Sequence, residues 1–252
     1  MNKNSKNTSW EKVSPWYNKI TQNSGHYYHE HTVIPGVLKL LDLKPGDKLL
    51  DVAAGSGVLG RAIPKGIDYL GVDVAPSLVA EAKRSDRNSS HKYEVGDVTK
   101  NLAIPSSFTK ATIILALQNI KEPAEAIKNI SDHLDQNGKL VIVLNHPMFR
   151  IPRQSSWGID PASKIQYRRI DRYMTPINIP ITAHPGEKHS EFTWSYHLPL
   201  WEYSRMLKEN GFAIELIEEW TSDKESVGRA SKMENRSRAE IPLFMALKCR
   251  KT

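Results

Sequence analysis

The sequence predicts an α/β protein with a doubly wound, Rossmann-like sheet of seven mostly parallel strands and an antiparallel last strand. Three observations favour this fold. Short apolar segments alternate with amphipathic helical segments, as they do where parallel strands are joined by crossover helices. Three of the apolar segments end at or near an aspartate, namely Asp51, Asp73 and Asp97. A glycine-rich turn at Gly55 and Gly57 follows the first, and ligands bind such turns at the carboxyl edge of a parallel sheet.

The expected elements follow from apolar period and turn residues. Strands are expected at residues 48–52, 67–75, 91–98, 111–120, 139–145, 213–220 and 241–250. Helices are expected at 25–43, from Val58 for roughly two turns to Pro64, and at 76–84, 123–134 and 199–212. The last two strands are separated by a polar stretch, residues 221–240, that reads as a loop. They are therefore expected to be antiparallel neighbours.

Residues 146–196 interrupt the alternation with prolines, aromatic residues and arginines, and show no clear helical or strand period. A connection of this length inside a compact domain is usually a lid or a binding element. We therefore expect a lid-like insertion after the fifth strand.

Composition narrows the class of protein. The chain has 252 residues, a formal net charge of +7 and one cysteine, Cys249, so it forms no internal disulfide. It contains no apolar run near the roughly 18 residues of a membrane span and no apolar signal core at its start. A cytoplasmic protein without membrane contact is expected. The basic charge raises two alternatives, nucleic acid or an anionic small substrate, beside the simpler one of a soluble basic surface.

Two kinds of cofactor use a glycine-rich turn of this form. Gly55, Gly57 and Gly60 fit G-x-G-x-x-G, and Asp73 lies near the position where a dinucleotide enzyme holds a ribose. Asp51 argues against a dinucleotide, because a carboxylate at this strand end repels a pyrophosphate but suits a cationic amino-acid group. A nicotinamide cofactor remains the alternative.

The pattern D-x-x-x-G-x-G at Asp51, Gly55 and Gly57 resembles the first motif of class I S-adenosylmethionine-dependent methyltransferases. Ala53 and Ala54 stand where the family usually has Gly-Cys. The resemblance covers about residues 26–250, is most like the small-molecule branch, and matches the insertion only in position.

The resemblance implies S-adenosylmethionine as the cofactor. The glycines would cradle its methionine part, Asp73 its ribose hydroxyls and Asp97 its adenine amino group. A simpler role for Asp73 is to cap the following helix. The implied cofactor-binding residues are Tyr27, Asp51, Ala53, Gly55, Ser56, Gly57, Asp73, Val74, Asp97, Val98, Leu117 and Gln118.

The resemblance also implies one methyltransferase domain over residues 1–252. Its parts are an N-terminal lid or tail at 1–25, a cofactor-binding half at 26–145, a substrate lid at 146–196, and a C-terminal helix and strand hairpin at 197–252. Residues 117–119 lack the Asn/Asp-Pro-Pro-aromatic motif of methyltransferases that modify nucleobase or glutamine nitrogens, which counts against those targets.

A small-molecule acceptor is the expected partner. The candidate acceptor-binding residues, chosen because arginine binds anions and aromatic rings stack on planar groups, are Arg150, Arg153, Trp157, Tyr173 and Tyr196. The same mixture could bind RNA, or simply pin the lid to its neighbours. An RNA or protein methyltransferase and a non-catalytic cofactor-binding module are the alternatives.

A hydroxyl or protonated amine acceptor needs a general base, whereas a carboxylate acceptor needs none. His146, at the end of the fifth strand, is the first candidate, followed by Tyr28 and His29. His26, His29 and His31 also raise the question of a metal. No metal is expected, because no further cluster of cysteines or acids completes a ligand set.

Overall fold

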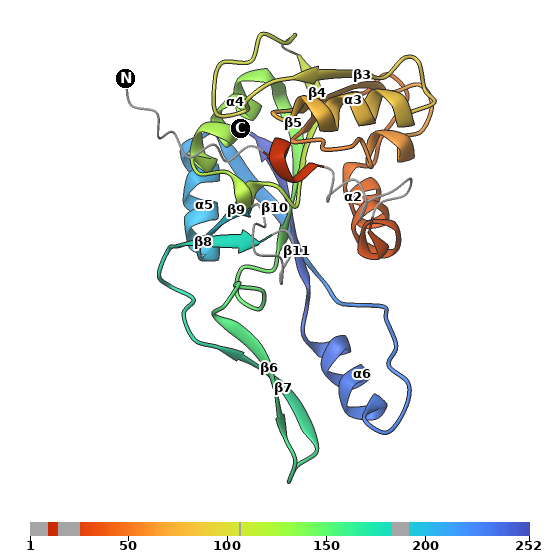
Figure 1. The fold of residues 1–252 in the computed structure, drawn as a ribbon. Helices are drawn as coiled ribbons and strands as arrows, with labels where there is room; N and C mark the ends of the chain where they lie inside the picture. Colours follow the sequence, from red (N-terminus) through yellow and green to blue (C-terminus); the bar gives the residue numbers. More distant parts are fainter. Residues whose placement is uncertain (1–9, 15–25, 106, 183–191) are drawn as a thin grey trace.

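A central sheet of seven strands in the order β10-β11-β5-β4-β1-β2-β3 organises the molecule (Figure 1). The computed structural model describes residues 10–14, 26–105, 107–182 and 192–252. The strands are β1 (Lys48–Val52), β2 (Asp68–Asp73), β3 (Lys92–Val95), β4 (Phe108–Ile114), β5 (Leu134–Asn145), β10 (Phe212–Trp220) and β11 (Phe244–Lys251). Only β11 runs antiparallel to its neighbours in this sheet. This confirms the predicted fold class, including the antiparallel last strand.

Two helical layers cover the sheet. The helices α2 (Ile34–Leu41) and α3 (Pro76–Ser85) pack on one face, and α4 (Pro123–His133) and α5 (Leu200–Glu209) pack on the other. Successive residues of a strand point to opposite faces of the sheet. Leu49 therefore packs in the core on the side of α2 and α3, and Leu50 packs in the core on the side of α4 and α5. Both are fully buried, and each contributes about 1.5–3 kcal/mol to folding by leaving water.

Three short helical turns and one π-helix complete this part of the fold. They are η1 (Trp10–Val13), the π-helix η2 (His29–Val33), η3 (Gly60–Ala62) and η4 (Leu117–Asn119). The π-helix runs directly into α2, so the predicted helix at 25–43 exists but is wider at its start.

The helix predicted from Val58 is wrong. Turns and the three-residue η3 stand there, because positive φ angles at Gly55 and Gly57 and the extended Ile63 before Pro64 leave too few residues for an α-helix.

Three predicted strand limits are also corrected. The third strand ends at Val95 and leaves Asp97 in a loop, and the fourth ends at Ile114, because Leu115 adopts a φ of 52°. The fifth strand begins at Leu134 and not at residue 139. Asn137, with a φ of 64°, lies inside it where the pairing with β4 is irregular.

The insertion predicted to lack regular structure contains two antiparallel hairpins. The first joins β6 (Ser155–Asp160) to β7 (Ile165–Ile170), and the second joins β8 (Ile177–Thr182) to β9 (Phe192–His197). The first hairpin buries none of its residues, so its sequence shows no apolar alternation.

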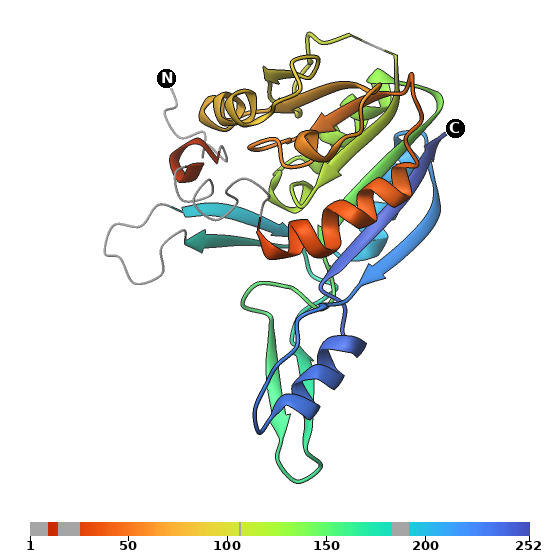
Figure 2. The same cartoon turned by 90° about the vertical axis from the view of Figure 1, so that its right-hand side faces the viewer.

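The region predicted as a loop at 221–240 also contains a helix, α6 (Ser231–Glu240), which packs against β7. Together β6, β7 and α6 form an arm that extends away from the sheet in both views (Figure 1, Figure 2). Only Ser237 of α6 is buried, and it donates to Gln166 at 2.6 Å. Of the helices that the structure describes, none is long and apolar enough to cross a membrane.

Candidate functional site

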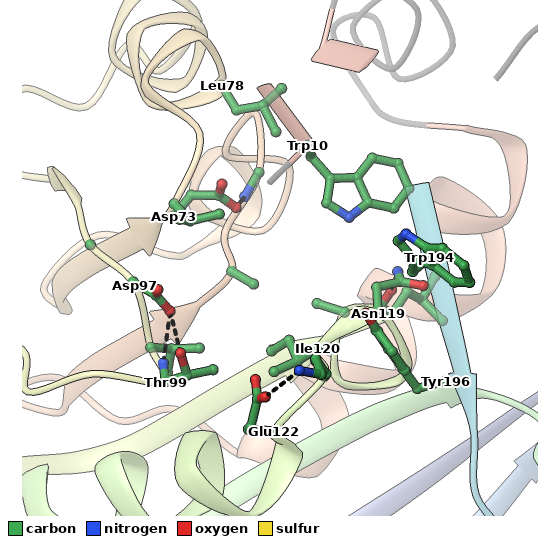
Figure 3. A pocket seen from close by; sticks show the side chains of 18 of the residues that line it. Trp10, Asp73, Leu78, Asp97, Thr99, Asn119, Ile120, Glu122, Trp194 and Tyr196 are labelled. Atoms are coloured by element: carbon green, nitrogen blue, oxygen red, sulfur yellow. Dashed lines mark hydrogen bonds and ion pairs between the residues drawn. The ribbon is translucent and has the colours of Figure 1, made fainter. Parts of the chain in front are cut away.

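A cavity of about 820 Å³ opens at the carboxyl ends of β1, β2, β3 and β4 (Figure 3). The strand order reverses here: β2 and β3 lie on one side of β1, and β4 and β5 lie on the other. Ligands of open α/β sheets bind at such points. The lining residues are Trp10, His29, Ala53, Gly55, Asp73, Val74, Leu78, Gly96, Asp97, Val98, Thr99, Lys100, Ile114, Leu115, Ala116, Asn119, Ile120, Lys121, Glu122, Asn178, Trp194 and Tyr196.

Asp73 and the glycine loop form one hydrogen-bonded unit. The backbone N–H of Gly55 donates to Asp73 Oδ2 and that of Ala75 donates to Oδ1, both at 2.9 Å. Burial raises the pKa of Asp73, although these backbone donors oppose the shift. Each carboxyl oxygen keeps a lone pair for a further donor. Asp73 can therefore accept two hydroxyl groups from a ligand in the cavity.

The turn after β1 is left-handed at three residues. Ala53, Gly55 and Gly57 have φ angles of 55°, 56° and 75°. This left-handed conformation suits glycine better than alanine. The N–H of Ala54 donates to Val72 O and that of Gly57 donates to Ala54 O, both at 3.0 Å. Ala53 and Gly55 line the cavity, whereas Ser56 and Gly57 lie behind it.

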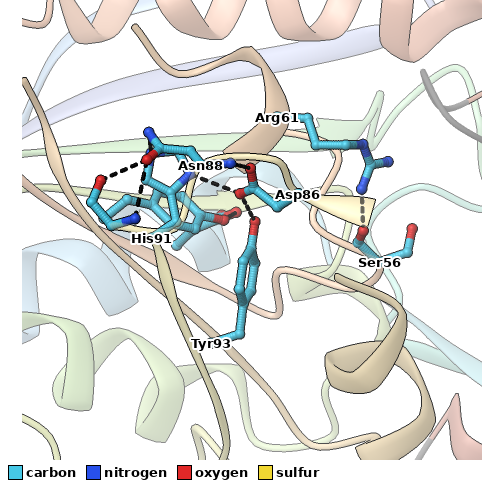
Figure 4. Close-up of polar contacts among 9 residues, drawn as sticks. Ser56, Arg61, Asp86, Asn88, His91 and Tyr93 are labelled. Carbon is cyan, nitrogen blue, oxygen red and sulfur yellow. Dashed lines mark hydrogen bonds and ion pairs between the residues drawn. The ribbon is translucent and has the colours of Figure 1, made fainter. Parts of the chain in front are cut away.

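The Tyr93 side chain packs against this turn at Gly57. A Cβ atom on Gly57 would lie 2.9 Å from Ala82 Cβ and from the Tyr93 hydroxyl, so the loop has no room for a side chain there. The Tyr93 hydroxyl donates to Asp86 Oδ2 at 2.6 Å, and His91 Nδ1 lies 2.7 Å from the same oxygen (Figure 4). Burial raises the pKa of Asp86, but these hydrogen bonds outweigh burial and the net shift is downward.

Asp51 does not line the cavity, although the resemblance implied that it binds cofactor. Its oxygens accept hydrogen bonds from Tyr69 at 2.7 Å and Thr112 at 2.8 Å, across the two neighbouring strands. It is buried, and burial raises its pKa to about 6. In this structure Asp51 joins β1 to β2 and β4 directly beneath the loop.

The segment after β3 brings Asp97, Val98 and Thr99 to the cavity (Figure 3). Asp97 Oδ1 accepts from the Thr99 N–H at 3.0 Å and its hydroxyl at 2.7 Å. Burial raises the pKa of Asp97, but Thr99 and Lys100 together lower it below its ordinary value. A charged carboxylate thus stands at the far end of the cavity from Trp194.

Leu117 and Gln118, both implied as cofactor contacts, are buried outside the cavity, and their neighbours Asn119 and Ile120 line it instead. The Gln118 amide donates to Leu115 O at 2.8 Å, which turns the side chain back into the chain.

Aromatic residues enclose the opposite end. Trp10 from η1 and Trp194 and Tyr196 from β9 converge there (Figure 3), and Asn178 from β8 also lines the cavity. The sequence predicted only Tyr196 of these. Trp10 was visible as a large apolar residue in a polar segment, and it places part of the predicted N-terminal lid or tail at the cavity. Residues 1–9 and 15–25 of that segment lie outside the described residues.

His29 is the only one of the three catalytic candidates that lines this cavity. Its Nδ1 accepts a 3.2 Å hydrogen bond from the His26 N–H. Burial lowers the pKa of His29 to about 4, so the ring is neutral at physiological pH. With Nδ1 used as an acceptor, the neutral ring carries its proton on Nε2.

His146 lies outside the cavity with both ring nitrogens engaged. Its Nε2 lies 2.7 Å from Glu219 Oε1, and its Nδ1 accepts from the N–H groups of Met148 and Phe149 at 3.2 and 3.3 Å. Burial lowers its pKa, against the opposing effect of Glu219. This geometry places the first candidate base at the root of the arm, just after β5 and outside the cavity.

The remaining predicted residues are distributed elsewhere. Tyr27 donates to Asp223 at 3.1 Å, and Tyr173 accepts from the Leu200 N–H at 2.9 Å. Arg153 lines neither this cavity nor the smaller one beside it. The smaller cavity, about 260 Å³, is lined by Tyr28, Arg150 and Trp157 among others.

The described residues contain no group of three or more His, Cys, Asp or Glu side chains that could hold a metal ion. The histidines of the first helix have separate partners: His26 packs on Tyr28, and His31 Nδ1 lies 3.0 Å from Asp223 Oδ2.

Comparisons with known proteins agree with this geometry. Residues 50–142 match a family model described as a methyltransferase domain. The chain is 31% identical over 114 residues to a demethylmenaquinone methyltransferase of Paenarthrobacter aurescens, covering 44% of each chain. It is 32% identical over 103 residues to a ubiquinone biosynthesis O-methyltransferase of Xanthomonas campestris, covering 39% of this chain and 43% of that one. The matches therefore span less than half of these relatives.

A solved S-adenosylmethionine-dependent methyltransferase from Mesorhizobium loti has the same fold, with a TM-score of 0.68 and 24% identity over 86% of this chain and 96% of that one. The family match covers β2, β3 and β4 and most of β1 and β5, and the cavity opens at the ends of the first four of these strands. Residues 50–142 of the chain thus match a methyltransferase domain, and the chain has the fold of a solved S-adenosylmethionine-dependent methyltransferase.

Proposed function

We propose that the chain transfers a methyl group from S-adenosylmethionine to a small aromatic acceptor. The observation that carries this proposal is the division of the 820 Å³ cavity into two chemically different ends. One end has carboxylates for a nucleoside, at Asp73 and Asp97, and the other has aromatic walls, at Trp10, Trp194 and Tyr196. A volume of this size holds a nucleoside and a small second substrate together.

The residues of the cofactor end fit S-adenosylmethionine. Asp73 has free lone pairs for the two ribose hydroxyls, Asp97 is a charged acceptor for an amino group, and Gly55 lets a ligand approach the backbone because it has no Cβ atom. The cofactor supplies an activated methyl group on a sulfonium, so the sulfur keeps the electron pair of the broken C–S bond. The chain's own residues then have to hold the acceptor in line and exclude water.

The aromatic end fits a planar acceptor, because aromatic rings stack on flat molecules at low entropic cost. The names of two relatives point to ring substrates, one in menaquinone and one in ubiquinone synthesis. We extend only the chemical class to this chain: a hydroxylated aromatic ring, methylated on oxygen or carbon.

His29 is proposed to orient the acceptor and not to deprotonate it. Its neutral ring presents an Nε2 proton when Nδ1 accepts from His26, so it can donate to an acceptor oxygen. A phenol with an electron-poor ring ionises without a strong base, and positioning then supplies most of the rate enhancement.

The test is isothermal titration of the purified chain with S-adenosylmethionine, S-adenosylhomocysteine and NAD, using wild type and Asp73→Ala. We expect both sulfur ligands to bind the wild type and to bind the variant at least about 10-fold more weakly, since a buried charged acceptor is lost. A charge-matched control is Asp68→Ala, an exposed residue at the other end of β2. Binding of NAD in place of both sulfur ligands would overturn the proposal.

The second candidate is an RNA acceptor, favoured by the basic residues of the arm. An RNA enzyme should bind tRNA with an affinity that falls steeply with salt, because phosphate contacts release counterions. Affinity that stays flat between low and physiological salt would leave the small acceptor as the better proposal.

A further inference from the structure

The smaller cavity lies where the arm joins the rest of the molecule, and no step of the proposed reaction uses it. Its volume is about 260 Å³. Three arginines line it, Arg150 after β5, Arg168 on β7 and Arg238 on α6, together with Tyr28, Ser222 and Trp157. These residues come from segments far apart in the chain, so the arm and the segment at Tyr28 build the cavity together.

Arg150 has no carboxylate within ion-pair distance and no side-chain hydrogen bond among the described residues. The guanidinium instead makes a cation–π contact: the Cζ atom of Arg150 lies 5.8 Å from the centroid of the Phe244 ring. Burial lowers the pKa of Arg150. A guanidinium has five N–H donors, and most such groups in a partly buried place are paired. Arg150 lines the cavity, and its donors have no acceptor within the part of the chain that the structure describes.

Arg168 adds a second uncompensated charge. Its Nε donates to Phe149 O and its Nη2 to Ser155 Oγ, both at 2.7 Å, which fixes the guanidinium beside Trp157 without any carboxylate. Burial lowers the pKa of Arg168, and the charge of Arg150 lowers it further. The two cations therefore repel each other, and an anion bound between them would relieve this repulsion.

The rest of the wall suits an anion as well. Arg238 already donates a hydrogen bond to Ser226 and forms an ion pair with Glu234 at 3.7 Å. Its contribution to an anion site would therefore be its positive charge more than free donors. The hydroxyls of Tyr28 and Ser222 lie 3.0 Å apart at the rim. Lys224 stands over the Tyr28 ring at 5.1 Å from its centroid. The nearby carboxylates have other partners: Glu219 bonds His146, and Asp223 bonds Tyr27 and His31.

We propose that the cavity between Arg150, Arg168 and Arg238 is a binding site for an anionic group, a carboxylate or a phosphate, of a small organic molecule. Arg150 supplies free paired donors, Arg168 supplies a second charge in fixed orientation, and Trp157 offers a flat apolar surface for the body of the ligand. This site goes beyond the proposed methyl transfer and does not depend on it. Tyr28 lines this cavity, whereas its sequence neighbour His29 lines the larger one.

The experiment titrates the full chain with inorganic phosphate and, separately, with benzoate, at constant ionic strength. Benzoate tests a carboxylate-bearing ligand and phosphate tests a phosphate-bearing one. The variants are Arg150→Gln and, as a charge-matched control, Arg169→Gln, whose exposed side chain pairs with Asp171 on the same hairpin. We expect saturable binding of at least one probe by wild type, weakened about 10-fold or more by Arg150→Gln and less than about two-fold by Arg169→Gln.

Two further measurements keep the result interpretable. Arg150→Lys preserves the charge but not the paired donors, and we expect it to weaken binding less than Arg150→Gln does. S-adenosylhomocysteine titration of each variant reports whether the larger cavity is intact. Absence of saturable binding to wild type at about 10 mM of either probe, or equal weakening by Arg150→Gln and Arg169→Gln, would overturn the proposal. Anion binding by a chain that binds no S-adenosylhomocysteine would sink the proposed function and leave this site standing.

Discussion

The hydroxyl oxygen of Tyr93 occupies the space that a Cβ atom on Gly60 would need. The same hydroxyl donates to Asp86, so it cannot swing away without losing a buried hydrogen bond. Gly60 lies on η3, just after the glycine-rich turn that follows β1, and its backbone conformation does not itself demand glycine. The glycine is therefore required by its neighbour and not by its own φ angle.

Gly60→Ala should lower the free energy of unfolding by about 1–3 kcal/mol, the usual cost of overpacking a core. In a Tyr93→Phe background the same change should cost at least about 1 kcal/mol less, because the colliding oxygen is gone. Urea unfolding of the four proteins measures both values. Equal costs in the two backgrounds would show that Tyr93 is not the obstacle.

Ala53 is a non-glycine residue held in the left-handed region, with a φ of 55°. Ala53→Gly should raise the free energy of unfolding by about 0.5–1 kcal/mol, since relief of the left-handed strain exceeds the added entropy of the unfolded chain. Thermal unfolding measures the change. Ala54→Gly, at a neighbouring residue without positive φ, is the control and should destabilise.

Asp51 should make stability depend on pH. The folded state raises its pKa from 3.8 to about 6, so the folded state binds the proton more tightly than the unfolded state does. Its contribution to stability is therefore present below about pH 4, falls as the pH rises to about 6, and is lost above that. The loss amounts to about 2–3 kcal/mol.

Asp51→Asn should remove this slope, so the difference in unfolding free energy between variant and wild type should change between pH 4.5 and pH 7.5 in favour of the variant. Asp68→Asn, at the exposed start of β2, is the matched control for the loss of one charge. An unchanged difference across that range would mean that Asp51 ionises as freely in the fold as in the open chain.

Substitution of His29 is expected to affect catalysis, whereas substitution of His146 is expected to affect stability. His29→Ala should lower kcat/KM for the methyl acceptor about 10-fold and leave S-adenosylhomocysteine affinity unchanged, because only a hydrogen bond to the acceptor is lost. The wild-type rate should show no ionisation of His29 near pH 6.5, since its pKa is about 4.

His146→Ala should instead lower the melting temperature, because the bonds to Glu219 and to the Met148 and Phe149 N–H groups are lost. Turnover per folded molecule should stay within about two-fold of wild type. A large loss of turnover in His146→Ala, with His29→Ala unaffected, would restore His146 as the base that its position at the end of β5 first indicated.

The cofactor half was readable from the sequence because each of its signals is local. The glycine turn, the strand-end position of Asp73 and the central apolar strand β4 are each set by a few consecutive residues. The orientation of the Asp51 side chain could not be predicted. Spacing places Asp51 in the strand but does not show that Tyr69 and Thr112, on the two neighbouring strands, donate hydrogen bonds to it.

The arm was missed for the opposite reason. Ser237 donates a hydrogen bond to Gln166, which lies 71 positions earlier in the sequence. Neither α6 nor the first hairpin has an apolar pattern strong enough to predict its secondary structure. Trp10 at the aromatic end of the cavity is a similar case, since its partners come from β9, far along the chain.

The arm also constrains the order of folding. Its hairpin is synthesised before β10 and β11, whereas α6, which covers it, is made only between those two strands. Long-range contacts of this kind carry a large loop-closure entropy and form late. The hairpin must therefore wait for nearly the whole chain, and the smaller cavity, which Ser222 and Arg238 help to line, reaches its final shape only then.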